Sequence, residues 1–332
     1  MNSYGITAAF DAGVFDQAEL APTVLDQVVA NGEMTVRYVG SHAVAEAGQF
    51  STAVDDIARI KAETETDHYH FRVLKIMDDG TVEGRTAAMF EDYQGEPGYS
   101  GETVFTEAQM SFMVLGAASQ GTDVHIHALG ERAIHEALNA IEAARRHKPD
   151  TPSRFTICHI QVITDEDLAR FAELDVIAQS TPLWAAYDQY GKQFVSEDQF
   201  NRFWRYNSLH ELGVKLTFGS DFPASGAGTL GISPLFNMQI GHTRQAPGEE
   251  DLYPVQPRES ERLDIDTLIR GYTIDAAWQL RMEDEIGSIE VGKKADFVVL
   301  DQNLFAVDSY DIHKVQVDMT VMSGDIVYSR DQ

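Results

Sequence analysis

The sequence predicts an α/β fold with parallel strands, followed by a small β-rich unit at the C-terminus. Short apolar runs rich in β-branched residues alternate with longer segments of helical periodicity, which is typical of parallel strands joined by crossover helices. This alternation covers most of the chain, and from Gly287 onward the pattern changes to turns and short strands. With 332 residues, of which 43% are hydrophobic, the chain has enough apolar material for a large core.

Each predicted strand is a short apolar run that ends at or near a polar residue. The strands are predicted at residues 6–11, 34–39, 71–76, 124–127, 155–159, 176–181 and 215–220. Helices are predicted where apolar residues recur three and four positions apart, at residues 17–30, 107–118, 131–146, 165–174, 200–212 and 263–280. Thr164 is a suitable N-cap for the helix at 165–174, because acidic residues follow it in the first turn.

The C-terminal region, residues 283–332, is predicted to form turns and strands, with Ser323-Gly324-Asp325 as a hairpin turn. We therefore place a domain boundary after residue 282. Two further segments, residues 78–106 and 222–258, are too long for simple connections between strands and helices. Loops of such length usually carry function.

The charge and composition exclude several classes of protein. The 25 Lys and Arg residues against 53 Asp and Glu give a formal net charge of −28, which would repel nucleic acid and anionic membrane surfaces. No apolar run reaches the roughly 18–20 residues of a membrane helix, and the N-terminus does not resemble a signal peptide, so we expect a cytoplasmic protein. The single cysteine, Cys158, excludes an intrachain disulfide and a multi-cysteine metal site. A metal would be held by His, Asp, Glu or lysine-derived ligands.

Four residues suited to metal chemistry lie at or just past the C-terminal ends of predicted strands. They are Lys75, His127, His159 and Asp221. A parallel β/α barrel builds its active site at this edge. Two neutral imidazoles can hold a divalent ion, and an acid on a later strand can orient and deprotonate a water. The pattern therefore predicts metal-assisted hydrolysis.

Each of these residues also has a structural interpretation. Taken singly, His127 and His159 are as readily core histidines with satisfied hydrogen bonds. Asp221, in the segment GSDFP, would serve as a turn or cap residue, and Lys75 as an ordinary lysine at a strand end. The four positions together favour a site.

Several segments resemble a known family. HALGERA (residues 127–133), CHIQVITDEDLARFAEL (158–174), LTFGSDFPAS (216–225), GSIEVGKKADFVVLD (287–301) and LKIMDDGTVEGRTAAMFEDY (74–93) resemble, in order and spacing, the YtcJ-like branch of the amidohydrolase superfamily. The resemblance covers nearly the whole chain. It implies a TIM (β/α)8-type barrel formed by residues 1–282 and the C-terminal part of a small β-domain formed by residues 283–332.

The resemblance also implies roles for the residues at the strand ends. His127 and His159 match metal ligands on the fifth and sixth strands of the family's barrel, and Asp221 matches the aspartate that contacts metal and shuttles a proton. Lys75 lies where a carboxylated lysine bridges two metals in binuclear members. The expected cofactor is a divalent metal, one or two ions, with zinc the preferred identity for His and Asp ligands.

One feature of the family has no counterpart in this sequence. The family's small N-terminal β-domain and its first barrel strand, which ends in His-x-His, are missing, and the chain opens on a segment that resembles the second strand. A barrel of seven strands has unpaired edges. We therefore expect either a truncated reading frame or closure of the sheet by another segment or by a second copy in a homodimer.

Four residues beyond the strand ends are predicted to contact substrate: Arg85, Trp184, His242 and Arg244. The alternatives are solvation for an arginine in a loop and simple packing for an aromatic residue. His125 faces the same side of its strand as His127, but the resemblance selects only His127.

The sequence thus predicts a metal-dependent hydrolase that cleaves an amide-type or formamide-type C–N bond in a small-molecule substrate. The alternative is a catalytically silent relative that binds a small molecule or a partner. The missing His-x-His favours this alternative.

Overall fold

The structure is a computed structural model that describes residues 1–13, 20–64, 66–187 and 190–331. The chain divides into two compact units. The first unit is Ala8–Ile177, and the second unit is Met1–Thr7 together with Ala178–Gln332. The predicted domain boundary after residue 282 falls inside the second unit.

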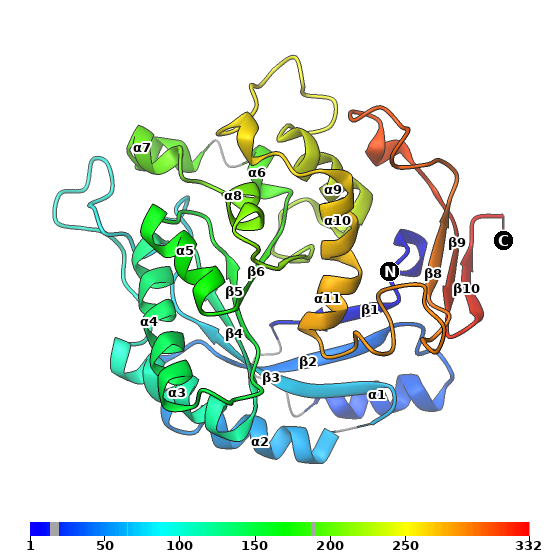
Figure 1. Cartoon of the computed structure of the whole chain (residues 1–332), viewed down its shortest axis with the longest axis horizontal. Helices are drawn as coiled ribbons and strands as arrows, with labels where there is room; N and C mark the ends of the chain where they lie inside the picture. The colour runs from blue at the N-terminus through cyan, green and yellow to red at the C-terminus, as the bar shows by residue number, and fades with distance from the viewer. Residues whose placement is uncertain (14–19, 65, 188–189, 332) are drawn as a thin grey trace. The chain divides into compact units, whose positions relative to one another are not determined.

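The first unit is built on parallel strands that pair in the order of the sequence (Figure 1). These strands are β1 (Ala8–Asp11), β2 (Arg37–Val44), β3 (Tyr69–Met77), β4 (Asp123–Ala128) and β5 (Phe155–His159). In the second unit, residues Ala178–Ser180 of a further strand, β6 (Val176–Ser180), pair in parallel with β7 (Leu216–Phe218). Each overlaps its predicted position, and β2 ends at Val44, beyond its predicted end at residue 39.

Crossover helices connect the strands of the first unit, as the alternating pattern predicted. They are α1 (Ala21–Ala30), α2 (Ala53–Thr64), α3 (Glu107–Gln120), α4 (Glu131–His147) and α5 (Asp165–Glu173). Residues 17–19 of the predicted first helix lie outside the described residues. Thr164 caps α5 as predicted, since its side chain accepts a hydrogen bond from the Asp167 amide.

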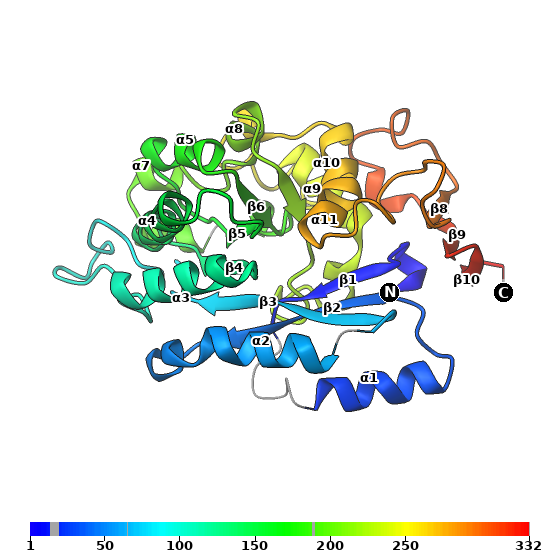
Figure 2. The ribbon, with the colours of Figure 1, turned by 60° about the horizontal axis from the view of Figure 1, so that its bottom comes forward.

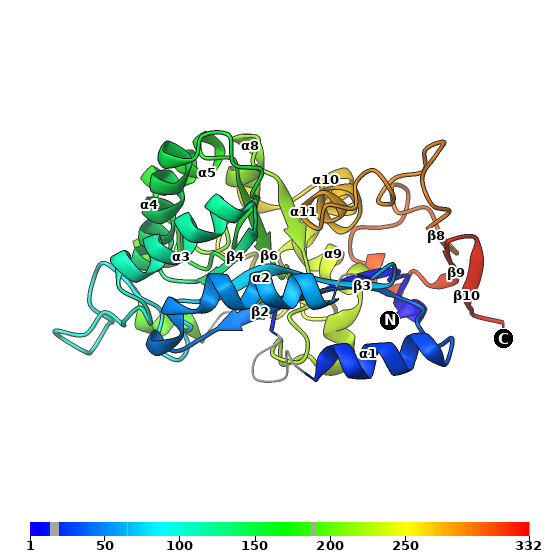
Figure 3. The same ribbon diagram turned by 90° about the horizontal axis from the view of Figure 1, so that it is seen from below.

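Helix α2 was not predicted from the sequence. It packs against β2 and β3 (Figures 2 and 3). Its buried residues Val54, Ile57 and Ile60 follow the three-to-four spacing of an amphipathic helix. The sequence therefore carried the signal for this helix, and the prediction omitted it.

A contact between Tyr69 and Asp26 joins α1 to the sheet. Tyr69, the first residue of β3, is 3% exposed, and its hydroxyl donates a hydrogen bond of 2.6 Å to Asp26 Oδ1. Burial first, and then the Asp26 carboxylate, raises the pKa of Tyr69 to about 12. Because the folded-state pKa exceeds the ordinary value of 10.0, the stabilisation is complete below pH 10 and is lost as the pH rises toward 12.

We therefore expect a pH-dependent difference between the wild type and Tyr69→Phe. Near pH 8 the variant should be less stable by about 1 kcal/mol, the contribution of one hydrogen bond. This difference in the free energy of unfolding should narrow as the pH is raised above 10, because only the wild type has the hydrogen bond to lose. Urea unfolding of both proteins across this range measures the gap, and a gap independent of pH would contradict the assignment.

The second unit holds shorter helices, and two predicted helices are broken in it. Its helices are α6 (Trp184–Tyr187), α7 (Glu197–Phe200), α8 (Tyr206–Glu211), α9 (Pro234–Thr243), α10 (Ile265–Tyr272) and α11 (Ile274–Gln279). The helix predicted at residues 200–212 is interrupted by Trp204, whose φ of 51° is left-handed. The one predicted at 263–280 breaks at Thr273, with φ −126° and ψ −97°. Apolar spacing continues through both breaks, which is why it did not reveal them.

Helix α9 lies within the segment 222–258 that was predicted as a loop. Eight of its ten residues are buried, on every side of the helix. A helix buried all round has no polar face, and its sequence therefore lacks the amphipathic period on which the prediction relied.

The C-terminal residues form a three-stranded antiparallel sheet in the order β10-β9-β8. Its strands are β8 (Phe297–Leu300), β9 (Val317–Met322) and β10 (Asp325–Ser329). The predicted hairpin turn is confirmed, because Ser323 and Gly324, with φ of 55° and 90°, are the two residues between β9 and β10. Thr320 in β9 donates a 2.7 Å hydrogen bond to the carbonyl of Asn2. Among the described helices, none has the length and apolar character needed to cross a membrane.

Candidate metal centre

The candidate site lies in the first unit, at the carboxyl ends of β3, β4 and β5. The register pairs Lys75 with His125 and His127 with Cys158 across neighbouring parallel strands. Residues that are paired in register, or two apart on one strand, point to the same face of a sheet. The side chains of Lys75, His125, His127 and Cys158 therefore share one face, and all four residues are buried.

His159 joins this group through an unusual backbone conformation. It follows Cys158 directly, and in a regular strand the two side chains would point to opposite faces. His159 instead has a left-handed φ of 74°, and Ile160 follows with a φ of 55°. The centroids of the His127 and His159 rings lie 4.4 Å apart. Such conformations cost roughly 1–3 kcal/mol each and are concentrated at functional sites.

The three histidines of this face are held in the neutral form. Burial first, and then the positive charge of Lys75, lowers the pKa of His127 to about 3. Burial also lowers the pKa values of His125 and His159 well below the ordinary 6.5. Neutral imidazole is the form that binds metal ions. Within the described chain, the buried Nε2 atom of His127 has no hydrogen-bond partner.

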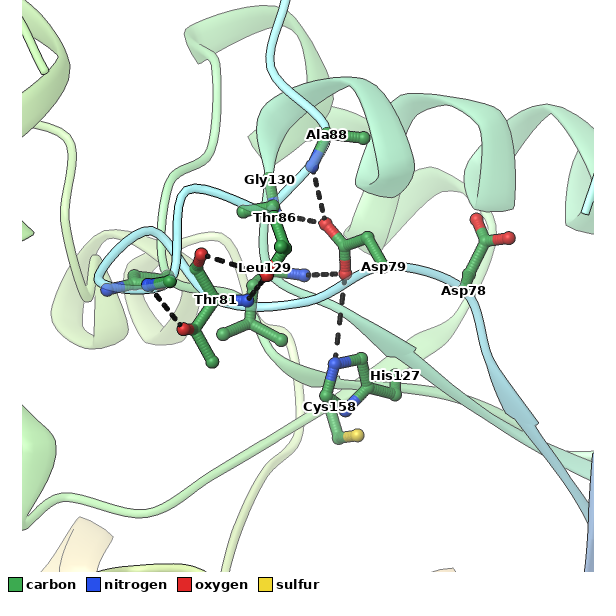
Figure 4. Close-up of polar contacts among 12 residues, drawn as sticks. Asp78, Asp79, Thr81, Thr86, Ala88, His127, Leu129, Gly130 and Cys158 are labelled. Atoms are coloured by element: carbon green, nitrogen blue, oxygen red, sulfur yellow. Dashed lines mark hydrogen bonds and ion pairs between the residues drawn. The ribbon is translucent and has the colours of Figure 1, made fainter. Parts of the chain in front are cut away.

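A buried carboxylate, Asp79, fixes the chain beside His127 (Figure 4). Its Oδ1 atom accepts a hydrogen bond of 2.9 Å from the Leu129 amide, and its Oδ2 atom accepts bonds of 2.8 Å and 3.0 Å from the amides of Gly130 and Ala88. Oδ1 also lies 3.8 Å from His127 Nε2. Burial raises the pKa of Asp79 to about 7, and the three amide donors offset part of that rise. Asp79 therefore ties the loop after β3 to the start of α4.

Asp79 was missed as a site residue from the sequence. The only local signal is the pair of aspartates that follows β3 and precedes Gly80. Its three donors lie 9, 50 and 51 residues away along the chain. No local pattern of spacing could connect them.

Lys75 contacts two of the residues on the shared face. Its Nζ atom lies 3.1 Å from His125 Nδ1 and donates a hydrogen bond of 3.0 Å to Cys158 Sγ. Lys75 is 3% exposed. Lys75 thus lies on the same face as His127 and contacts His125 and Cys158. The metal-ligand roles of Lys75, His127 and His159 stay predictions.

Two other predicted residues lie in loops. Arg85, in the first unit, has a left-handed φ of 54° and forms an ion pair with Glu96. Asp221 belongs to the second unit, three residues after β7, and is exposed. Its φ of 47° is again left-handed. Asp221 and His159 thus both adopt a left-handed conformation that most non-glycine residues rarely take.

The remaining predicted residues are in the second unit, and each has neighbours there. Trp184 begins α6, and its ring lies 5.7 Å from that of Trp204. His242 Nδ1 donates a hydrogen bond of 2.7 Å to the Leu263 carbonyl, and His242 Nε2 lies 3.0 Å from Ser309 Oγ. Arg244 is fully buried and donates hydrogen bonds of 2.7 Å and 3.0 Å to backbone carbonyls. These contacts tie loops together, and the substrate-binding roles of all three residues stay predictions.

The residues at the ends of β4 and β5 suit a divalent ion. His127, Cys158 and His159 each offer one ligand atom, and these atoms all lie within 4.8 Å of one another. Imidazole nitrogen and thiolate sulfur are the ligands that zinc prefers. The chain is therefore a β/α protein with a candidate metal centre, formed by histidines at the carboxyl ends of parallel strands.

The chain belongs to the amidohydrolase family, whose sequence profile matches residues 1–328. It is 29% identical over 264 residues to "Putative amidohydrolase YtcJ" of Bacillus subtilis, covering 79% of this chain and 48% of that protein. It is 25% identical over 246 residues to "N-substituted formamide deformylase" of Arthrobacter pascens, covering 73% of this chain and 43% of the relative. The chain thus spans about half the length of these relatives. The predicted family resemblance is confirmed.

Solved structures show the same fold. An uncharacterized metal-dependent hydrolase from Pyrococcus horikoshii matches with a TM-score of 0.75 at 22% identity, covering 92% of this chain and 58% of that one. A second such hydrolase, from Pyrococcus furiosus, matches with a TM-score of 0.74 at 24% identity, covering 91% and 57%. The predicted fold class, an amidohydrolase-type α/β barrel with a small C-terminal β-unit, is confirmed by these matches.

Proposed function

We propose that this chain carries the metal centre of a hydrolase that cleaves an amide-type or formamide-type C–N bond in a small molecule. The observation that carries the proposal is the pair of buried, neutral histidines, His127 and His159, in ring contact at the ends of adjacent parallel strands. The similarity to a formamide deformylase supports the bond class. Zinc is the proposed ion, because imidazole nitrogens are among the ligands that it prefers.

His127 and His159 would hold the ion in this proposal. A divalent ion at this place supplies Lewis-acid polarisation of a carbonyl and lowers the pKa of water. The left-handed backbone at His159 accompanies the contact of its ring with that of His127, and Asp79 fixes the loop beside His127. The chain thereby presents two imidazoles whose positions are set by buried backbone contacts, as a preorganised site requires.

Asp221 is proposed to move the proton. As general base it would accept a proton from the attacking water, and as general acid it would deliver that proton to the leaving amine. This role follows the match of Asp221 to the family's aspartate, and its left-handed φ of 47° is a conformation that aspartate and asparagine adopt more readily than most residues.

The metal content of the purified chain tests this proposal. After loading with zinc and removal of excess metal, elemental mass spectrometry should find close to one ion per chain. The double variant His127→Ala/His159→Ala should lose it, because two ligands are gone. The matched control is His147→Gln, which changes an exposed histidine in the last turn of α4 and should keep the ion.

Hydrolysis should depend on the bound metal. A panel of N-formyl amines and simple amides should be turned over by the loaded chain and not by the chelated one. A folded wild type, checked by circular dichroism, that retains no ion would contradict the proposal. If the chain retains one ion but hydrolyses no amide of the panel, the hydrolase proposal is contradicted and the alternative of a metal-containing binding protein is supported.

A further inference from the structure

A serine and a histidine of the second unit share a hydrogen bond at the wall of a pocket. The pocket has a volume of about 430 Å³, which is within the range of small-molecule sites. Ser309 Oγ lies 3.0 Å from His242 Nε2, and both residues are half-buried and line the pocket. His242 belongs to α9, and Ser309 lies between β8 and β9. The fold of the second unit thus places a hydroxyl and an imidazole together beside a space of the size of a small molecule.

The hydrogen bonds of His242 fix which of its ring nitrogens carries the proton. Nδ1 lies 2.7 Å from the carbonyl oxygen of Leu263, and a carbonyl can only accept, so Nδ1 is the donor. In the neutral ring, Nε2 is therefore the acceptor, and the Ser309 hydroxyl donates to it. A hydroxyl bonded to a base whose ring is oriented by a third group is the arrangement of an activated nucleophile.

Asp264 adds a negative charge beside this pair. It is the N-cap of α10 and lines the same pocket. The hydrogen bond from the Thr267 amide is the main cause that lowers the pKa of Asp264, and the charge of His242 contributes. Asp264 is therefore ionised at neutral pH. Its carboxylate stabilises the imidazolium that forms when His242 takes up a proton.

The first turn of α10 brings hydrogen-bond donors to the pocket. Ile265 and Asp266 are the first two residues of the helix, and both line the pocket. The N–H groups at these two positions have no partner within the helix. Amides at a helix N-terminus stabilise negative charge that develops on a carbonyl oxygen. The pocket therefore combines a nucleophile, a base and donors for an oxyanion.

We infer that Ser309 and His242 form a second, metal-independent centre in this chain, which hydrolyses esters. Ser309 Oγ attacks the ester carbonyl carbon while His242 Nε2 takes the hydroxyl proton. The ester C–O bond then breaks, and His242 delivers that proton to the departing alcohol. Water attacks the acyl-serine and gives a proton to His242, which returns it to Oγ as the acid leaves. This activity uses none of the proposed metal ligands and is independent of the proposed function.

The lining of the pocket defines the class of ester. Apolar side chains form much of it, namely those of Ile265, Leu304, Phe305, Val307 and Ile312. They suit a short apolar acyl group. The carboxylates of Asp264 and Asp266 in the same lining repel an anionic substrate. We therefore expect uncharged esters of short apolar acids to be the substrates.

An uncharged fluorophosphonate tests the nucleophile on the native chain, because it reacts with a serine hydroxyl that a neighbouring base activates. After incubation in the presence of a chelator, peptide mass spectrometry should find the label on Ser309. The internal control is Ser288, whose hydroxyl contacts Glu290 and Lys293 instead of an imidazole. Ser309 should react at least about a hundredfold faster than Ser288, the usual contribution of a general base. A folded wild type in which both serines react at the same rate would overturn the inference.

Hydrolysis of p-nitrophenyl butyrate tests the complete reaction. The wild type should hydrolyse this ester equally well with and without a chelator. Ser309→Ala should lose the activity, His242→Gln should reduce it at least about a hundredfold, and Ser288→Ala should keep it. Absence of turnover, turnover abolished by the chelator, or turnover that survives Ser309→Ala would overturn the second centre and leave the proposed function in place. A wild type that retains no metal but hydrolyses the ester would overturn the proposed function alone.

Discussion

The Asp221→Asn variant is expected to bind metal as the wild type does and to hydrolyse its amide substrate about 10²–10⁴ times more slowly, the usual contribution of a general acid–base group. The substitution keeps the size of the side chain and removes its ability to carry the proton. Asparagine also tolerates the left-handed φ of 47° at this position, so the backbone should be unchanged. The measurement is turnover of the substrate identified in the amide panel, with metal content determined on the same samples.

A second substitution separates the proton shuttle from the backbone. Asp221→Gly relieves the left-handed conformation and should make the chain at least as stable as the wild type in urea unfolding. Its turnover of the amide substrate should nevertheless be as slow as that of Asp221→Asn. Turnover at the wild-type rate in either variant would show that Asp221 does not carry the proton.

Asp79→Ala is expected to destabilise the chain by about 3–5 kcal/mol. The substitution leaves the buried amides of Ala88, Leu129 and Gly130 without their acceptor, and each unsatisfied group costs about 1–3 kcal/mol. Urea unfolding at neutral pH measures the loss.

The adjacent aspartate offers a matched control. Asp78 is also buried, but its side chain accepts one long backbone hydrogen bond, 3.3 Å from the Phe105 amide. Burial, followed by the charge of Asp79, raises the pKa of Asp78 to about 8, so at pH 7 it is mostly uncharged in the folded chain. Asp78→Ala should therefore cost about 1 kcal/mol. Equal losses from both substitutions would contradict the role assigned to the three amides of Asp79.

Much of the fold could be predicted because its signals are local. The strand β5 (Phe155–His159) has the predicted bounds, since its apolar run is short and bounded by polar residues. The Thr164 cap and the hairpin at Ser323 and Gly324 depend on residues next to each other in the chain. The breaks at Trp204 and Thr273 could not be predicted, because the apolar spacing on either side of each break is compatible with one continuous helix.

The sequence by itself determined the α/β class, the family, and the placement of Lys75, His127 and His159 at neighbouring strand ends, because the strand pattern sets which residues finish each strand. The contacts around Cys158 and Asp79 were decided only by the tertiary structure. Cys158 faces the histidines because β4 and β5 pair in one particular register and because His159 turns left-handed. Asp79 finds its donors as many as 51 residues away, where two loops meet. Register and loop packing arise from interactions between distant segments, and no local pattern in the sequence records them.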